Sequence, residues 1–266
     1  MIYGVTYSSG NMDKSAQLCA ESMERHGVDD VRVLSPSWWR HWKGEDTFDW
    51  LNRDILKSER GHGFWLWKSW AISYRMNDIK DGDYLVYSDA GVEFIAPINH
   101  IIDRMDQDIF FFTNGFPHVE WCKWDVISAI NSPAWHKTHL GDGWFISDKW
   151  IRDFKQVQAS VIFIKVNRST RNFIKEWLLY CQMPGFIDDS PSKLPNYPTF
   201  AEHRHDQAIL SCLQIKYGYE VHFWPTIYSE HIRHTAQPGD NYPVMFNHHR
   251  RRDPGCGNGE PEWPNS

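Results

Sequence analysis

The sequence predicts an α/β fold in which a mixed, mainly parallel sheet is flanked by helices. Short segments rich in β-branched and aromatic residues alternate with segments whose apolar residues recur at helical spacing. This alternation favours parallel pairing of successive strands in a doubly wound sheet. Ligands of such sheets bind at the carboxyl ends of the strands, so the residues that follow each strand are the first candidates for a site.

The alternation is clearest in the first 115 residues. Residues 2–7 (IYGVTY) are expected to form a strand that ends in a polar loop, and a helix is expected over 13–26. The following expected elements are a strand at 31–36, helices at 51–60 and 65–76, a strand at 84–94, a helix at 96–105 and a strand at 108–114.

The second half is less regular. Its expected elements are a strand at 158–166, an amphipathic helix at 169–181, a helix at 206–217 that ends at Gly218, and a strand at 220–225. Residues 183–200 form a Pro-rich loop that is long for a compact domain, which indicates a functional or mobile segment. The tail from 254 is expected to be frayed and flexible.

Composition excludes several classes of protein. The formal net charge of -6 and the pI of about 6.1 leave no broad basic surface for a nucleic-acid backbone. Neither a signal peptide nor a run of 18 apolar residues is present, so we expect a cytoplasmic protein without a membrane span. The five cysteines lack CxxC spacing, which argues against a disulfide framework and a zinc knuckle.

Aromatic residues are unusually abundant, with 15 Trp, 15 Phe and 11 Tyr. Their rings stack on nucleobases and on the C–H faces of sugars, and Trp N–H and Tyr O–H groups add polar contacts. Packing in the core is the alternative role for any single ring.

The end of the strand at 84–94 carries the most suggestive polar residues. Ser88, Asp89, Ala90 and Gly91 follow a buried apolar run, at the edge where a parallel sheet collects ligands. A carboxylate there can hold a divalent cation that neutralises two phosphates, although Asp-Ala-Gly also describes an ordinary turn.

Several separated motifs carry a resemblance to a known family. They are Arg60-Gly61-His62-Gly63-Phe64-Trp65-Leu66-Trp67-Lys68, Asp81-Gly82-Asp83 and Tyr87-Ser88-Asp89-Ala90-Gly91, followed by Trp121-Cys122-Lys123, Gln158-Ala159-Ser160, His205-Asp206-Gln207 and His248-His249-Arg250-Arg251-Arg252. This series resembles the RGxGYWxWK, DGD and YxDAG pattern of glycosyltransferases with the A-type fold that large algal viruses, phages and bacteria encode. The resemblance spans residues 1 to 252.

The resemblance implies a Rossmann-like catalytic domain at 1–253, with a nucleotide-binding half at 1–115 and an acceptor-binding half at 116–253. It implies transfer of a sugar from a nucleotide-sugar, expected to be a UDP-sugar, to a glycan or another hydroxyl acceptor.

Asp89 matches the first aspartate of the family's DxD motif, which bridges a metal and the ribose or diphosphate. Gly91 stands in place of the second aspartate, so dependence on Mn²⁺ or Mg²⁺ is left open. Glu93 or His248 would supply the further ligand, and His248 is preferred because a neutral imidazole binds divalent metals well.

Other residues are expected to contact the nucleotide-sugar. Thr6 and Tyr7 end the first strand and are candidates for the uridine, with Tyr7 either stacked on the base or packed in the core. Arg60 and Lys68 would pair with the diphosphate if they point into the cleft, and would otherwise form a solvated face.

The motif positions add Ser88, Ala90, Gly91, Ser160 and His205 to the predicted donor-binding residues.

Asp206 and Gln207 are the candidate catalytic residues beside Asp89. Asp206 would act as a base on the acceptor hydroxyl or hold sugar hydroxyls, while Gln207 would donate to developing charge. Capping of the following helix is the structural alternative for this polar run.

Two other functions remain open. A metal-dependent hydrolase would be built from Asp89, His203, His205, Asp206 and His248, although no motif such as HExxH is present. A non-catalytic carbohydrate-binding protein would use the aromatic surface alone, and would not need Asp89 together with Asp206.

Overall fold

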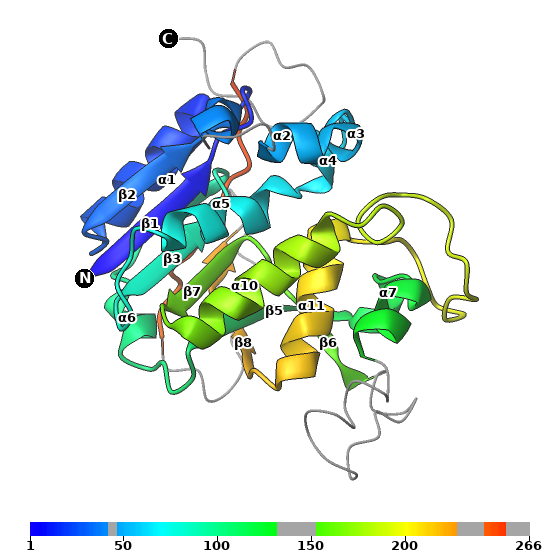
Figure 1. The fold of residues 1–266 in the computed structure, drawn as a ribbon. Coiled ribbons are helices and arrows are strands. Elements are labelled where there is room, and N and C mark those ends of the chain that lie inside the picture. Colours follow the sequence, from blue (N-terminus) through cyan, green and yellow to red (C-terminus); the bar gives the residue numbers. More distant parts are fainter. Residues whose placement is uncertain (42–46, 132–152, 228–241, 254–266) are drawn as a thin grey trace.

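A seven-stranded sheet forms the centre of the computed structural model, which describes residues 1–41, 47–131, 153–227 and 242–253 (Figure 1). Its strands are β1 (Ile2–Tyr7), β2 (Asp30–Leu34), β3 (Tyr84–Ser88), β5 (Ile109–Pro117), β6 (Lys155–Val157), β7 (Val161–Lys165) and β8 (Val221–Phe223). Neighbouring strands follow the order β2-β1-β3-β7-β5-β6, and β8 pairs with β5.

The strand directions make the sheet mixed but largely parallel. β1 pairs in parallel with β2 and β3, and β5 with β8. β7 lies antiparallel between β3 and β5, so β5 points the same way as β3. Only β6 and β7, among the described strands of this sheet, run in the opposite direction. The predicted α/β fold class is therefore confirmed.

Helices cover both faces of the sheet. The helical elements are α1 (Asp13–Arg25), η1 (Pro36–His41), α2 (Phe48–Leu51), α3 (Arg53–Leu56), α4 (Gly61–Phe64), α5 (Trp67–Met76), α6 (Asn99–Ile102), η2 (His118–Glu120), α7 (Trp124–Ile130), α10 (Arg168–Cys181) and α11 (His205–Tyr217). α5, α10 and α11 pack on one face, and α1 and α6 on the other (Figure 1). A small sheet of β4 (Val92–Phe94), β10 (Phe246–His248) and β9 (Thr226–Ile227) extends the second layer.

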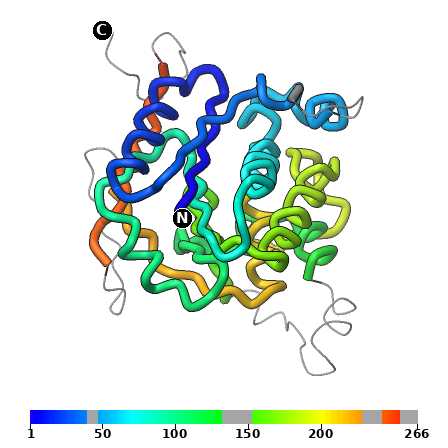
Figure 2. The backbone as a smooth tube through the Cα atoms, turned by 60° about the vertical axis from the view of Figure 1, so that its left-hand side comes forward, coloured from blue at the N-terminus to red at the C-terminus, as the bar shows by residue number. Residues whose placement is uncertain are grey.

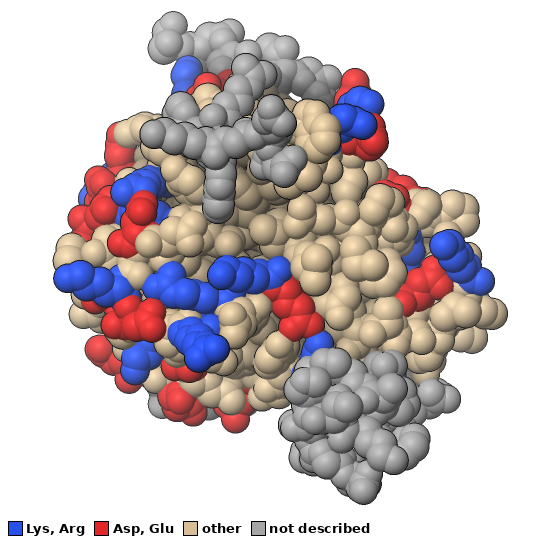
Figure 3. Space-filling view, viewed as in Figure 1, with Lys and Arg blue, Asp and Glu red and all other residues tan. Residues whose placement is uncertain are grey.

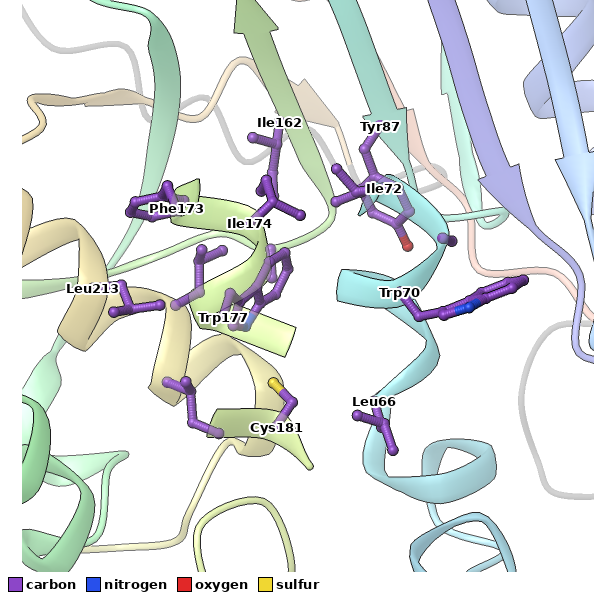
Figure 4. Packing of buried hydrophobic residues seen from close by; sticks show 14 of the residues in the cluster. Leu66, Trp70, Ile72, Tyr87, Ile162, Phe173, Ile174, Trp177, Cys181 and Leu213 are labelled. Atoms are coloured by element: carbon purple, nitrogen blue, oxygen red, sulfur yellow. The ribbon is translucent and has the colours of Figure 1, made fainter. Parts of the chain in front are cut away.

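The core follows the alternation of side chains along the strands. In β3, Leu85 and Tyr87 face α5 and α10, whereas Val86 faces the α1 layer. Figure 4 shows Tyr87 of β3 and Ile162 of β7 pointing toward the helix layer, where they meet Ile72 of α5 and Ile174 of α10. This two-sided burial explains why the strands are apolar throughout.

The C-terminal segment, residues 246–253, lies beside the N-terminal half (Figure 2). The Ser15 hydroxyl donates to the carbonyl of Arg251 at 2.7 Å, and the Asp253 carboxylate accepts the backbone N–H groups of Asp13 and Lys14. A carboxylate at the start of α1 complements the unpaired N–H groups and the dipole there. The segment is thereby held close to the carboxyl ends of β1 and β3.

Several predicted elements differ from those observed. The expected strand at 84–94 is divided, because the chain turns after Ser88 and residues 92–94 pair with β10 instead. The expected helices at 51–60 and 96–105 are shorter. Within 96–105, only residues 99–102 are helical, and Ile98 and Ile101 supply the buried contacts.

The surface drawn in Figure 3 mixes basic and acidic side chains with large uncharged areas. No helix in the described parts of the chain has both the length and the apolar character needed to cross a membrane. The tail from 254, which we predicted to be frayed, lies outside the described residues.

Candidate functional site

A cavity of about 430 Å³ lies at the carboxyl ends of β1 and β3. Tyr7 ends β1, and Asp89 directly follows β3. Because β7 is antiparallel, its amino end reaches this same edge, and the Asp89 N–H donates to the Ser160 carbonyl at 2.8 Å. The position is the one predicted from strand direction, and the volume is typical of small-molecule sites, which span about 300–1,000 Å³.

The lining residues come from segments far apart in the sequence. They are Tyr7, Ser9, Met12, Arg60, Trp65, Trp67, Lys68, Asp89, Ala90, Gly91, Gln158, Ser160, Glu202, His203, Arg204, His205, Asp206, Gln207, His248, Arg250 and Arg252. Five are Lys or Arg and three are Asp or Glu, whereas the whole chain has a formal charge of -6. The cavity is therefore a basic site in an acidic protein, which favours an anionic ligand.

Lys68 lies between two carboxylates on the floor of this site. Its ammonium is 3.2 Å from Asp89 Oδ1 and 3.2 Å from Asp206 Oδ2, and the side chains of Lys68 and Asp206 are each only 5% exposed. The Tyr87 hydroxyl donates to the same Oδ1 of Asp89 at 2.5 Å. One cation and one hydroxyl thus hold two carboxylates contributed by β3 and α11.

The pKa values of this cluster follow from its burial. Burial lowers the pKa of Lys68, but the carboxylates of Asp206 and Asp89 outweigh it, and the pKa is raised above its ordinary value. Burial also raises the pKa of Asp206 to about 6, with the charge of Asp89 adding to the rise and Lys68 opposing it. Asp206 therefore loses its proton close to neutral pH, as a general base does.

Residues 61–65, which include the short element α4, form a left-handed turn between α3 and α5. All five have φ between 53° and 89°. A Cβ on Gly61 would lie 2.4 Å from the ring of Trp65, so glycine is required there. Three residues of the turn are not glycine, and each costs about 1–2 kcal/mol in this conformation. Strain of this kind concentrates at functional sites, and the turn places Trp65 in the cavity wall.

Side-chain contacts connect the left-handed turn to the start of α11. The ring of Phe64 stacks on His205, with centroids 5.2 Å apart, and Asp189 accepts hydrogen bonds from both His205 Nε2 and Arg60 at 3.0 and 3.2 Å. Burial lowers the pKa of His205, and its φ of 45° is strained for a residue with a side chain. These contacts fix the position of the next residue, Asp206.

The C-terminal segment closes another side of the cavity. The Arg250 N–H donates to the Gly91 carbonyl at 3.1 Å, and a Cβ on Gly91 would lie 3.0 Å from Arg250 Cα. Gly91 therefore makes room for the chain's own backbone. The Arg250 guanidinium donates to His248 Nε2 at 3.3 Å, and Arg252 lines the cavity beside them.

Most of the predicted site residues meet at this cavity. Those that line it are Tyr7, Arg60, Lys68, Asp89, Ala90, Gly91, Ser160, His205, Asp206, Gln207 and His248. Thr6 and Ser88 do not line it. Both are fully buried beside Cys19 of α1, because alternation along the strands turns them away from the α5 side, which Tyr7 and Tyr87 face.

Tyr7 packs in the core, which was the alternative to stacking on the base. The residue is 2% exposed, and its ring stacks on Trp67 with centroids 4.1 Å apart. Its hydroxyl has no hydrogen-bond partner among the described residues, so a ligand in the cavity could supply one.

Asp89 and His248, the residues predicted to hold a divalent cation, both line the cavity. His248 Nε2 accepts from Arg250, and burial together with the Arg250 charge lowers the pKa of His248 well below its ordinary value. Glu93, the other ligand considered, contacts Arg25 and Asn247 and does not line the cavity. Its alternating position in β4 turns it away.

One compact group of three His, Cys, Asp or Glu residues occurs among the described residues. It consists of His118, Cys122 and Cys212, whose ligand atoms lie within 4.8 Å of one another in the core. Burial raises the pKa of the Cys122 thiol, whereas hydrogen bonding to Cys122 and His118 outweighs burial and lowers that of Cys212 to about 6. None of the three lines the cavity.

Two features of the site were not predicted from the sequence. Arg204 and Glu202 line the cavity, and the Arg204 guanidinium lies 4.1 Å from the ring centroid of Trp121. The pairing of Lys68 with both carboxylates was also missed. The sequence does contain an indication of this pairing, since Lys68 is the only charged residue in the apolar run FWLWKSWAI.

Comparisons with known proteins add a likeness of structure. No protein-family model matches the chain, and no curated protein matches it. One similar solved structure is a glycosyltransferase involved in the glycosylation of the major capsid of PBCV-1, with 13% sequence identity, coverage of 86% of this chain and 84% of that chain, and a TM-score of 0.41. The site is therefore interpreted from its own geometry.

Proposed function

We propose that the protein is a glycosyltransferase that moves a sugar from a nucleotide-sugar to a hydroxyl acceptor. The observation that carries this proposal is a basic cavity at the strand ends that contains a buried carboxylate, Asp206, poised to titrate near neutral pH. A basic lining suits a diphosphate, and a buried base suits an acceptor hydroxyl. The family resemblance of the motifs supports UDP as the nucleotide and a glycan or similar hydroxyl compound as the acceptor.

The lining residues suggest how the donor would be held. Arg250 and Arg252 of the C-terminal segment, together with Arg60, would pair with the diphosphate. Asp89 would accept hydrogen bonds from ribose or sugar hydroxyls, since its side chain is one-quarter exposed while Lys68 and Tyr87 hold one of its oxygens. The buried Tyr7 hydroxyl, which has no partner among the described residues, would form a hydrogen bond with a polar group of the nucleotide.

The reaction would depend mainly on charge stabilisation and alignment. The acceptor oxygen forms a bond to the anomeric carbon, and the bond from that carbon to the diphosphate oxygen breaks. Asp206 takes the acceptor proton, and the arginines stabilise the departing diphosphate. Gln207, whose amide contacts Gln156 and the Ala159 N–H, would orient the transferred sugar.

Release of UDP from UDP-sugars tests the proposal. Wild-type protein should release UDP slowly from at least one UDP-sugar with water as the acceptor, and faster once a suitable hydroxyl acceptor is added. Asp206→Asn should remove the acceleration. Sugar binding without any release of UDP would indicate a carbohydrate-binding protein, and hydrolysis of unrelated esters without UDP release would indicate a hydrolase.

A further inference from the structure

The strongest unexplained feature of the cavity is a buried lysine between two carboxylates that could otherwise share a cation. Lys68 projects from α5 and lies 3.2 Å from one oxygen of Asp89 and from one oxygen of Asp206. Mn²⁺ and Mg²⁺ bind carboxylate oxygens at about 2.0–2.2 Å and need several such ligands. An ion placed between these two carboxylates would meet a buried ammonium of the same sign of charge.

The positions around Lys68 also disfavour a divalent ion. A second aspartate at position 91 is disfavoured by the Arg250 backbone, because a Cβ on Gly91 would lie in a tight contact of 3.0 Å with Arg250 Cα. His248 accepts a hydrogen bond from the Arg250 guanidinium. Positively charged side chains of the protein therefore lie where a divalent metal ion would need its ligands.

We propose that this protein binds its nucleotide-sugar without a divalent metal ion, because the Lys68 ammonium occupies the cation position between Asp89 and Asp206 and the arginines of the C-terminal segment neutralise the diphosphate. The inference rests on the proposed function for the identity of the ligand. It makes Lys68 a positioning residue that holds two carboxylates, and it assigns Arg250 and Arg252 to the phosphates.

Metal binding by the wild-type protein gives the first test. Free Mn²⁺ has a six-line electron paramagnetic resonance signal that is lost when the ion is bound. We expect the Mn²⁺ signal to be the same with and without the wild-type protein. This should hold both in the absence of UDP and at a fixed concentration of UDP. Loss of signal at about stoichiometric protein would overturn the inference, whether or not the protein proves to be a transferase.

Donor affinity separates this inference from the proposed function. By calorimetry, UDP should bind in EDTA and in Mn²⁺ with dissociation constants that agree within about twofold. Binding that requires Mn²⁺ would overturn the inference and leave the transferase proposal standing. Failure to bind any nucleotide in either buffer would overturn the transferase proposal, while the resonance experiment would still decide whether the site takes a metal.

A matched pair of lysine variants gives the third test. Lys68→Met should leave two carboxylates without their cation, so Mn²⁺ should raise the melting temperature of this variant but not that of the wild type. Lys216→Met removes another buried lysine, which pairs with Glu176 away from the cavity, and should show no response to Mn²⁺. A Lys68→Met protein that ignores Mn²⁺ would contradict the assignment of Lys68 to the cation position. If this variant does not fold, the two wild-type experiments decide.

Discussion

The two ends of helix α11 carry similar groups of side chains in different surroundings. At the carboxyl end, Lys216 pairs with Glu176 of α10, and the Tyr217 hydroxyl donates to the same carboxylate. At the amino end, Lys68 pairs with Asp89, and the Tyr87 hydroxyl donates to that carboxylate. Each end therefore combines a buried lysine, a carboxylate and a tyrosine.

The difference between the ends lies in charge balance and space. Lys216 pairs with Glu176 and suits the negative end of the helix dipole. Lys68 has a second partner, Asp206, and the group borders a cavity beside a strained residue, His205. A buried carboxylate and lysine beside an open cavity are therefore a stronger candidate for function than a similar pair away from it.

Asp206→Asn should have the largest effect on activity. Removing the base should lower the transfer rate by about 10²–10⁴-fold, the range typical of general acid–base catalysis. The matched change at the other end, Glu176→Gln, should lower the melting temperature and leave the rate close to that of the wild type. Initial rates and thermal melts of both variants would measure this. Equal loss of rate in the two variants would remove the functional distinction between the ends.

Asp89→Asn should have the next largest effect. The substitution keeps the shape of the side chain but removes a charged acceptor, which should lower transfer by about 10–100-fold through weaker charge-assisted hydrogen bonds. The fold should persist, because Lys68 keeps Asp206 as a partner. Steady-state kinetics with circular dichroism as the folding control would test this, and a near-normal turnover would refute the role of Asp89.

Acidification should slow transfer. Burial raises the pKa of Asp206 to about 6, so below that pH the base is protonated and the rate should fall by about tenfold per pH unit. The same shift affects stability with a defined sign. The native carboxyl holds its proton to higher pH than the unfolded one, so this group's contribution to stability decreases as pH rises from about 4 to about 6.

The pH–rate profile of Glu176→Gln should keep this acidic limb, whereas any residual activity of Asp206→Asn should lack it. Burial and the neighbouring positive charges of His205 and Lys123 lower the pKa of His203 to about 3, so it stays neutral through this range. A limb that persists in Asp206→Asn would assign the titration to another group.

Tyr7→Phe should have the smallest effect. Loss of the hydroxyl should weaken UDP binding by about 2–10-fold, the value of one hydrogen bond, and should leave the melting temperature unchanged. Tyr7→Ala, in contrast, should cost about 3–5 kcal/mol of stability, because its ring packs on Trp67. Calorimetry and thermal melts would separate the two effects. Unchanged UDP affinity in Tyr7→Phe would place the hydroxyl outside the donor site.

Local patterns in the sequence were enough to predict six of the seven strands of the main sheet and its longer helices, but not β6 or α7. β1, β3 and β7 are short apolar runs, and α1 and α10 show regular helical spacing, so each element carries its own signal. The site edge could be predicted as well, since it follows from strand direction. The division of residues 84–94 between two sheets could not, because it depends on pairing with β10 near the other end of the chain.

Side-chain partnerships within the site were the least predictable part. Lys68 and Asp206 meet only after α5 and α11 pack on the same face of the sheet, and no local spacing reports such a contact. Thr6 and Tyr7 were both expected to contact the uridine, but neighbouring residues of a strand face opposite sides, and only Tyr7 lines the cavity. The role of Gly91 was also hidden, because its close neighbour is the distant backbone of Arg250.

A crystal structure of the protein with a non-hydrolysable UDP-sugar analogue tests the account most directly. We expect the diphosphate to lie within hydrogen-bonding distance of Arg250 and Arg252, with Lys68 still between Asp89 and Asp206. An analogue bound away from the edge formed by β1 and β3, or an edge filled by side chains that exclude it, would contradict the proposed transferase site.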